Sequence, residues 1–147
     1  EHVNQLIFTR QVIDEAQRLY PQAFQLTRVA RQNCILGEES VTAGTRIIIP
    51  IYALHRHRRH WADPDSFNPD RFARDVAKPN RYIYLPFGAG PRICLGASLA
   101  MVEAVTILAT LVRSADFSVS AAHKIWPVAR TTLVPRGGML MRVKRSF

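Results

Sequence analysis

The chain has 147 residues, of which 48% are hydrophobic and 21% charged. This size and composition fit one modest domain with its own core and exclude a disordered or fibrous protein. The formal net charge of +9 favours acidic partners, which include nucleic acids, anionic membranes, acidic proteins and carboxylate ligands, without choosing among them.

The first predicted element is a helix. The polar N-terminal residues lack a starting Met and a signal-peptide pattern, which suggests that upstream sequence is missing. Thr9 is expected to cap a helix that runs to about Tyr20, where Pro21 stops it. The apolar residues that fall near one face of this helix are Phe8, Val12, Ala16 and Leu19.

A hairpin is predicted next. Ser40–Thr42 and the β-branched run Ile47–Ile49 read as two strands, and Ala43 and Gly44 read as the turn between them. The chain from residue 60 to residue 91 is expected to be irregular, because prolines interrupt it too often for long elements.

A second helix is predicted from about Leu95 to Arg113. Glu103 is its only internal charge, so the helix should be buried, and Gly96, Ser98 and Glu103 break the apolar run too often for a transmembrane span. Strand-like pieces follow at residues 132–134 and 139–143, joined through Gly137 and Gly138. Since no linker interrupts the sequence, residues 1–147 are expected to form a single unit without an internal boundary.

The most informative segment is residues 87–96, Phe-Gly-Ala-Gly-Pro-Arg-Ile-Cys-Leu-Gly, immediately before the second helix. A cysteine at a helix N-terminus is stabilised as a thiolate by the helix dipole and free N–H groups. The glycines at 88, 90 and 96 allow a flat ligand to approach the backbone. Arg92 could reach an anionic group on such a ligand, and Phe87 could shield the Cys94 sulfur. The alternative is a buried structural cysteine in a glycine-rich turn.

The pattern Phe-x-x-Gly-x-Arg-x-Cys-x-Gly in this segment resembles the haem-binding loop of the cytochrome P450 family. Two further features carry the resemblance. Glu15 and Arg18 share a helix face at i and i+3, and residues 67–72, Phe-Asn-Pro-Asp-Arg-Phe, look like the loop that supplies a second arginine, here Arg71. The resemblance implies that Glu15, Arg18 and Arg71 form a buried charge network behind the haem; the alternative is that all three are solvated.

The resemblance also implies a cofactor and an activity. The iron of haem b would take Cys94 as its axial ligand, with Phe87, Gly88 and Gly96 around the cofactor and with Arg92 and Arg28 on its propionates. The alternative for Arg28 is a plain surface arginine. The implied reaction is monooxygenation of a small organic substrate, with electrons from a redox protein such as a ferredoxin or a reductase. No residue of this chain is assigned a catalytic role.

The basic cluster at residues 55–60, His-Arg-His-Arg-Arg-His, has several interpretations. His55, His57 and His60 could bind a metal, or the tract could contact nucleic acid. Nothing else in the chain completes a metal site, and no aromatic residues interleave the cluster, so a structural and solvated role is favoured. Propionate contact by His55 and partner docking remain open, and no nucleic-acid partner is expected.

The expected fold is mainly α with a small β portion, the C-terminal part of the cytochrome P450 fold. It should be incomplete, because family members are several-fold longer and carry a distal helix upstream. Three hypotheses follow: a portion of a working monooxygenase, a truncated non-catalytic relic, or a basic binding module without haem. The location is expected to be cytoplasmic, with no membrane contact from this segment, although any membrane anchor in the family would lie upstream.

Overall fold

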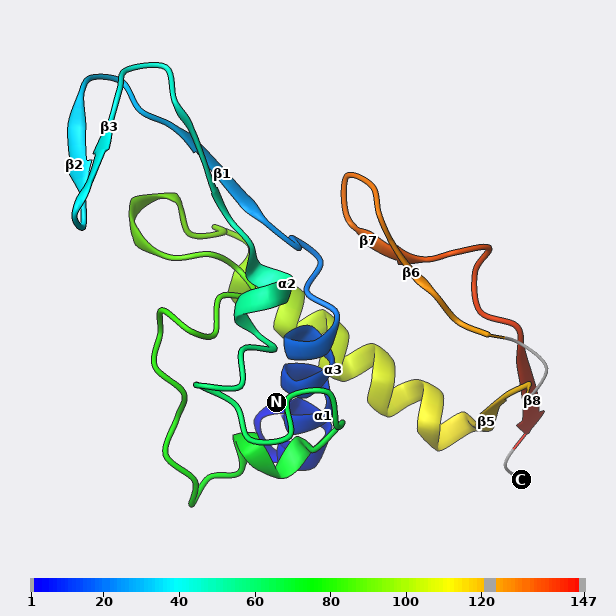
Figure 1. The fold of residues 1–147 in the computed structure, drawn as a ribbon. Helices are drawn as coiled ribbons and strands as arrows, with labels where there is room; N and C mark the ends of the chain where they lie inside the picture. The colour runs from blue at the N-terminus through cyan, green and yellow to red at the C-terminus, as the bar shows by residue number, and fades with distance from the viewer. Residues whose placement is uncertain (1, 121–123, 146–147) are drawn as a thin grey trace.

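The computed structural model describes residues 2–120 and 124–145. Its helical elements form the centre of the molecule (Figure 1). In chain order they are the 3-10 turn η1 (Val3–Gln5), helix α1 (Ile7–Leu19), helix α2 (Ile51–Leu54), the 3-10 turns η2 (Pro69–Phe72) and η3 (Gly90–Arg92), and helix α3 (Ala97–Ser114).

The strands form four antiparallel two-stranded sheets. They are β1 (Leu26–Val29), β2 (Cys34–Leu36), β3 (Glu39–Val41), β4 (Arg46–Ile49), β5 (Ala115–Val119), β6 (Pro127–Ala129), β7 (Leu133–Pro135) and β8 (Met141–Arg145). The pair β2–β3 lies within the connection between β1 and β4, and β6–β7 lies within the connection between β5 and β8. Two β arms therefore extend from the helical centre on different sides (Figure 1). The expected combination of helices with a small β portion is confirmed.

The end of α1 is confirmed and its start is not where the sequence predicted. The helix ends at Leu19, and Tyr20 closes it by donating its N–H to the Ala16 carbonyl at 2.7 Å. Thr9 lies inside the helix rather than at its cap, because the cap is Leu6, which uses no side-chain hydrogen bond. The turn η1 ends at Gln5, directly before this cap residue.

The buried face of α1 shares only Leu19 with the apolar face that the sequence predicted. Phe8 is 64% exposed, and the other buried residues of the helix are Gln11, Glu15 and Arg18. Three of these four side chains are polar. The helix is therefore held by a polar cluster as well as by hydrophobic packing, an arrangement that hydrophobic periodicity cannot reveal.

The predicted hairpin between residues 40–42 and 47–49 is wrong in its pairing. Ser40 faces Ile35 in the β2–β3 pair, and Ile47 faces Arg28 in the β1–β4 pair. A turn at Gly37, whose φ of 65° suits glycine, closes the inner pair. Gly44, with φ 84°, lies in the connection from the inner to the outer pair. The two predicted strands correspond to β3 and β4, but β3 pairs with β2 and β4 pairs with β1.

The segment from residue 60 to residue 91 is irregular as expected, with 3-10 turns as its only regular elements. The short helix α2 was not predicted. Its first residue, Ile51, is completely buried, and the N–H of Tyr52 donates to the Phe24 carbonyl at 2.9 Å. This helix ties the end of the β1–β4 arm to the centre.

Helix α3 is found within two residues of its predicted bounds, but it is not buried. Its buried side chains are Met101 and Val105, while Leu99, Val102 and Ile107 are exposed. The buried strip contacts α1, where Gln17 Nε2 lies 3.2 Å from Met101 Sδ. By length and composition alone α3 could cross a membrane, a test that core helices also pass. The described residues leave most of its apolar surface uncovered.

The strands of the tail are confirmed with small shifts and with new partners. β7 pairs with β6, through Val134 opposite Val128, and β8 pairs with β5, through Val143 opposite Phe117. The N–H of Leu133 donates to the Gln22 carbonyl at 3.1 Å, which attaches this second arm to the chain that follows α1.

Candidate functional site

The cysteine loop is closed on itself by backbone hydrogen bonds. The Cys94 N–H donates to the Phe87 carbonyl at 2.9 Å, and the Gly88 N–H donates to the Leu85 carbonyl at 3.1 Å. Between these bonds the chain makes the 3-10 turn η3. The loop is therefore a compact unit whose two ends are joined before α3 begins.

The thiol of Cys94 is exposed and free, and so is that of Cys34, so the two cysteines form no disulfide. α3 begins at Ala97 with Gly96 as its cap, which places Cys94 just outside the first helical turn rather than in it. The Ala97 N–H donates to the Cys94 carbonyl at 3.3 Å. The alternative of a buried structural cysteine is therefore wrong, and the sulfur is accessible to a ligand.

Two glycines of the loop have the backbone conformation that favours glycine. Gly88 has φ 76° and Gly90 has φ 72°. Gly96 has an ordinary φ of −83°, and a Cβ there would lie 4.0 Å from the Cys94 sulfur, which is normal contact. The loop shape therefore requires glycine at 88 and 90 and does not require it at 96.

The two candidate propionate ligands are both exposed and belong to different elements. Arg92 lies in η3, and Arg28 lies on β1, where its Nη1 donates to the carbonyl of its neighbour Thr27 at 2.9 Å. β1 passes beside the cysteine loop, because a Cβ at Gly88 would lie 3.6 Å from Leu26 Cδ1. Phe87 is half-buried at the start of the loop.

The structure brings Glu15, Arg18 and Arg71 into one ion cluster. Arg18 Nε and Nη2 donate to the two Glu15 carboxylate oxygens at 2.7 and 2.8 Å, and Arg71 Nε lies 3.3 Å from Oε1. The Asn68 N–H also donates to Oε1, at 2.8 Å. The Glu15 and Arg18 side chains are completely buried and that of Arg71 is 14% exposed. These three side chains are not solvated, contrary to the alternative.

All five N–H donors of Arg18 have acceptors. Besides the two bonds to Glu15, its guanidinium donates to three backbone carbonyls from the chain after α2, those of His55, Pro64 and Ser66, at 2.8, 2.7 and 3.1 Å. One side chain of α1 thus fixes the course of the irregular segment. Sequence reasoning missed these partners because backbone carbonyls carry no sequence signal.

An aromatic group packs against this cluster. Phe72 lies 4.9 Å from Tyr84 between ring centroids, Trp61 lies 6.3 Å from each of them, and the Arg18 guanidinium lies 5.1 Å from the Trp61 ring. The Tyr84 hydroxyl donates to the Asp14 carbonyl at 2.9 Å and lies 3.1 Å from its carboxylate. Burial, followed by the Asp14 charge, raises the pKa of Tyr84 above its usual range, so it remains a neutral donor.

His55, from the basic cluster, is completely buried and uses both ring nitrogens. Its Nε2 accepts from the Leu85 N–H at 2.8 Å, which assigns the proton to Nδ1, 3.2 Å from the Arg18 carbonyl. Burial is the main cause that lowers the pKa of His55 to about 4. The suggested propionate contact by His55 is therefore wrong, because neither nitrogen is free. Among the described residues, moreover, no group of three or more metal-ligating side chains occurs.

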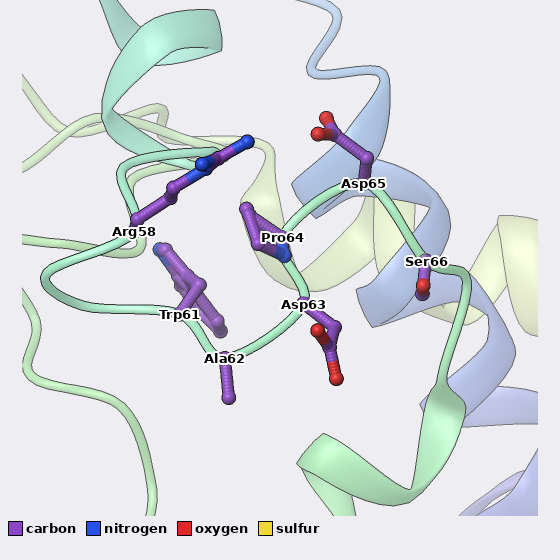
Figure 2. Close-up of a pocket in the computed structure, with 7 residues that line it drawn as sticks. All are labelled: Arg58, Trp61, Ala62, Asp63, Pro64, Asp65 and Ser66. Atoms are coloured by element: carbon purple, nitrogen blue, oxygen red, sulfur yellow. The ribbon is translucent and has the colours of Figure 1, made fainter.

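A hollow of about 460 Å³ is drawn in Figure 2, and two residues of its lining, Pro64 and Ser66, accept hydrogen bonds from Arg18 through their carbonyls. A single loop lines it, with Arg58, Trp61, Ala62, Asp63, Pro64, Asp65 and Ser66. Its lining includes no residue of the cysteine loop, so Cys94 and this hollow are separate features of the described chain.

Comparison with known proteins agrees over nearly the whole sequence. The sequence model of the family described as Cytochrome P450 matches residues 1–144. Similar proteins include a cytokinin hydroxylase of Arabidopsis thaliana, 37% identical over 98% of this chain and 28% of its own length. An 11-oxo-beta-amyrin 30-oxidase of Glycyrrhiza uralensis is 36% identical over 94% and 27%. A thromboxane-A synthase of Sus scrofa is 34% identical over 90% and 25%. The chain thus spans about a quarter of the length of these relatives.

Proposed function

The chain belongs to the cytochrome P450 family, and from this we propose that it is the haem-binding portion of a monooxygenase in which Cys94 is the axial ligand of the iron. The single observation that carries the proposal is the free, exposed thiol on a loop whose backbone is closed by the bond from the Cys94 N–H to the Phe87 carbonyl.

The residues of the loop fit a haem. A thiolate is one of the axial ligands that haem iron takes in proteins, and when bound there, haem supplies the activation of dioxygen for oxidation of an organic substrate. Gly88 and Gly90 keep the loop free of side chains where it turns. The exposed apolar side chains of Ile93 and Leu95, on either side of the cysteine, offer a surface suited to a flat apolar disc.

Arg92 and Arg28 are assigned to the haem propionates in this proposal. Both guanidinium groups are exposed, and β1, which carries Arg28, passes beside Gly88. The planar fork of arginine suits a carboxylate better than a lysine ammonium does. Phe87 and Gly96 flank the thiol along the chain, at the two ends of the loop, where Phe87 would limit access of water to the sulfur.

The Glu15, Arg18 and Arg71 cluster holds the scaffold behind the loop. Its bonds reach from α1 to the irregular chain at residues 55–71 and so fix the segment that leads to the cysteine. We assign these three residues a structural role and no part in bond making or breaking.

The substrate is proposed to be a small organic molecule and the partner an electron-donor protein, a ferredoxin or a reductase. The printed names of the relatives describe a hydroxylase, an oxidase and a synthase, which are different oxidations of different compounds. The net charge of +9 suits an acidic redox partner. The cytoplasmic location stays a prediction.

A non-catalytic relic is the second candidate. The observation that favours it is the exposed apolar surface of α3, including Leu99, Ile107 and Leu111, which the described residues leave without a neighbour. The two candidates differ in whether the protein holds haem through Cys94, which one experiment decides.

The experiment is the absorption spectrum of the reduced, haem-loaded protein under carbon monoxide. We expect the red-shifted Soret band of a thiolate-ligated ferrous carbonyl. Cys94→His should abolish this band, even if haem is retained, because imidazole replaces the thiolate. The matched control is Cys34→Ser, which removes the other exposed cysteine and should leave the band unchanged. A band that survives Cys94→His would refute the ligand assignment, and failure of the natural protein to bind haem would favour the relic.

A further inference from the structure

A continuous path of hydrogen bonds joins the buried ion cluster to the cysteine loop, and His55 is its central link. The Arg18 carbonyl lies 3.2 Å from His55 Nδ1, and His55 Nε2 accepts from the Leu85 N–H at 2.8 Å. The Leu85 carbonyl in turn accepts from the Gly88 N–H at 3.1 Å, inside the loop that ends at Cys94.

Tyr84, the residue before Leu85, makes a second attachment between this segment and α1. The Tyr84 hydroxyl bonds to the carbonyl and carboxylate of Asp14 on α1, and the Tyr84 ring lies 5.3 Å from the His55 ring. Residues 84 and 85 are therefore attached to α1 at two adjacent points. One attachment is made by a tyrosine that stays neutral and the other by a histidine.

We propose that His55 is a positioning residue that fastens the entry of the cysteine loop to α1, and that its protonation releases this fastening. The inference concerns the placement of the loop, so it holds whether or not Cys94 binds haem.

The chemistry of the imidazole explains the release. A neutral His55 can accept from Leu85 only through an unprotonated Nε2, so a proton on that nitrogen turns the acceptor into a second donor that faces the Leu85 N–H. The surroundings also oppose the positive charge. The Arg18 guanidinium lies on the α1 side, Arg56 is the next residue in the chain, and the Tyr84 ring is neutral. The nearest carboxylate of the cluster, Glu15, is already bound to Arg18 and Arg71.

The direction of the pH dependence follows from linkage. We call the state in which His55 Nε2 accepts from the Leu85 N–H the closed state, and the state without this bond the open state. In the closed state the pKa of His55 is about 4, below its ordinary value of 6.5. The closed state is therefore fully favoured above pH 6.5 and loses stability as the pH falls from 6.5 toward 4, because the open state takes up a proton that the closed state does not. The equilibrium constant between the open and the closed state should therefore rise by up to about tenfold for each unit by which the pH falls in this window.

The test is amide hydrogen exchange followed by mass spectrometry on the intact protein, with intrinsic exchange rates corrected for pH. We expect the peptides covering residues 84–94 to lose protection below pH 6.5. The logarithm of the protection factor should fall with pH at the slope expected for the uptake of one proton. His55→Gln keeps one donor and one acceptor but has no group that titrates, so its protection should be independent of pH in this window. The matched control His57→Gln alters an exposed histidine two residues away and should retain the slope of the natural protein.

Three outcomes would overturn the inference. One is a natural protein whose 84–94 peptides show no pH-dependent loss, a measurement that does not depend on whether any variant folds. Another is a His55→Gln protein with an unchanged slope. Tyr84→Phe removes the tie to Asp14 and should raise exchange equally at every pH, without changing the slope. A Tyr84→Phe protein that lost the slope would contradict the inference, because the pH response would then not belong to His55.

Discussion

At the scale of single residues, Arg18 joins α1 to the irregular chain that follows α2. Its guanidinium satisfies a buried carboxylate and three backbone carbonyls at once. Lysine has three donors in place of five and no planar fork, so it could not fill this position. Buried charges of this kind are tolerated only when every donor and acceptor is paired, which makes removal of one partner far more costly than loss of a surface ion pair.

We therefore predict that Glu15→Ala lowers the free energy of unfolding by about 3–5 kcal/mol, because it leaves the buried Arg18 without its carboxylate partner. Arg71→Ala should act in the same direction by removing the second arginine from Glu15. Denaturant unfolding measured with haem content as a second signal checks both variants. The matched control is Arg10→Ala, which breaks the exposed pair between Arg10 and Asp14 on the same helix and should cost less than about 1 kcal/mol. Near-normal stability of Glu15→Ala and Arg71→Ala would contradict the prediction.

The sequence could reveal some members of this site and not others. The spacing of Glu15 and Arg18 and the resemblance of residues 67–72 to a known loop were enough to predict an interaction with Arg71. In the sequence, His55 is one of three histidines in a basic cluster and Tyr84 is one aromatic residue in a proline-rich segment, and neither position indicates a buried, hydrogen-bonded side chain. Their burial depends on contacts across 30 and 70 residues of chain, to Leu85 and Asp14 respectively, which local patterns do not encode.

At the scale of elements, helix positions were predicted better than strand partners. The C-terminal end of α1 and the bounds of α3 follow from proline, glycine and the length of the apolar run, which are local signals, whereas the start of α1 was misplaced. Strand partners depend on which turn closes first, and the turn at Gly37 was not recognised, so residues 40–42 were paired with the wrong strand. The apolar pattern of α3 indicated burial, whereas the described residues cover only the strip around Met101 and Val105.

The exposed side of α3 leads to a prediction about solubility. Replacing Leu99 and Ile107, which are 64% and 58% exposed, by lysine should reduce aggregation of residues 1–147 with little loss of thermal stability, because most of each side chain already faces solvent. Light scattering and thermal unfolding measure the two effects. Val105→Lys is the comparison on the same helix, since Val105 is 2% exposed and a lysine there should prevent folding. Aggregation that is unchanged by the double replacement would show that another surface drives it.

At the scale of the whole molecule, the proposed function would give the described chain one side of a haem to support. It carries the thiol, two exposed arginines and the ion cluster, and its length is about a quarter of that of its relatives. A disc of apolar character held only by such a loop would keep one face open to water.

We predict that residues 1–147 refolded with haem and supplied with an electron donor give no oxygenated product. Electrons delivered to such an open site should appear as hydrogen peroxide, because none of the described residues is assigned to exclude water or direct protons on the uncovered face. Product analysis by mass spectrometry together with a peroxide assay is the measurement, and the same protein refolded without haem is the control for haem-dependent peroxide. Product formed in proportion to the electrons consumed would contradict the prediction.

Both β arms have the same nested design, with a short inner pair of strands inside the connection of an outer pair. This arrangement bears on the order in which the arms form during folding. The entropic cost of joining two strands rises with the length of free chain between them. When β2 and β3 have closed, the chain between β1 and β4 is effectively shorter, and the same holds for β6–β7 within β5–β8. Each arm can therefore close from its tip toward the helices. The rate at which the outer strands meet is then governed by turns such as that at Gly37, which contribute no residue to the ion cluster.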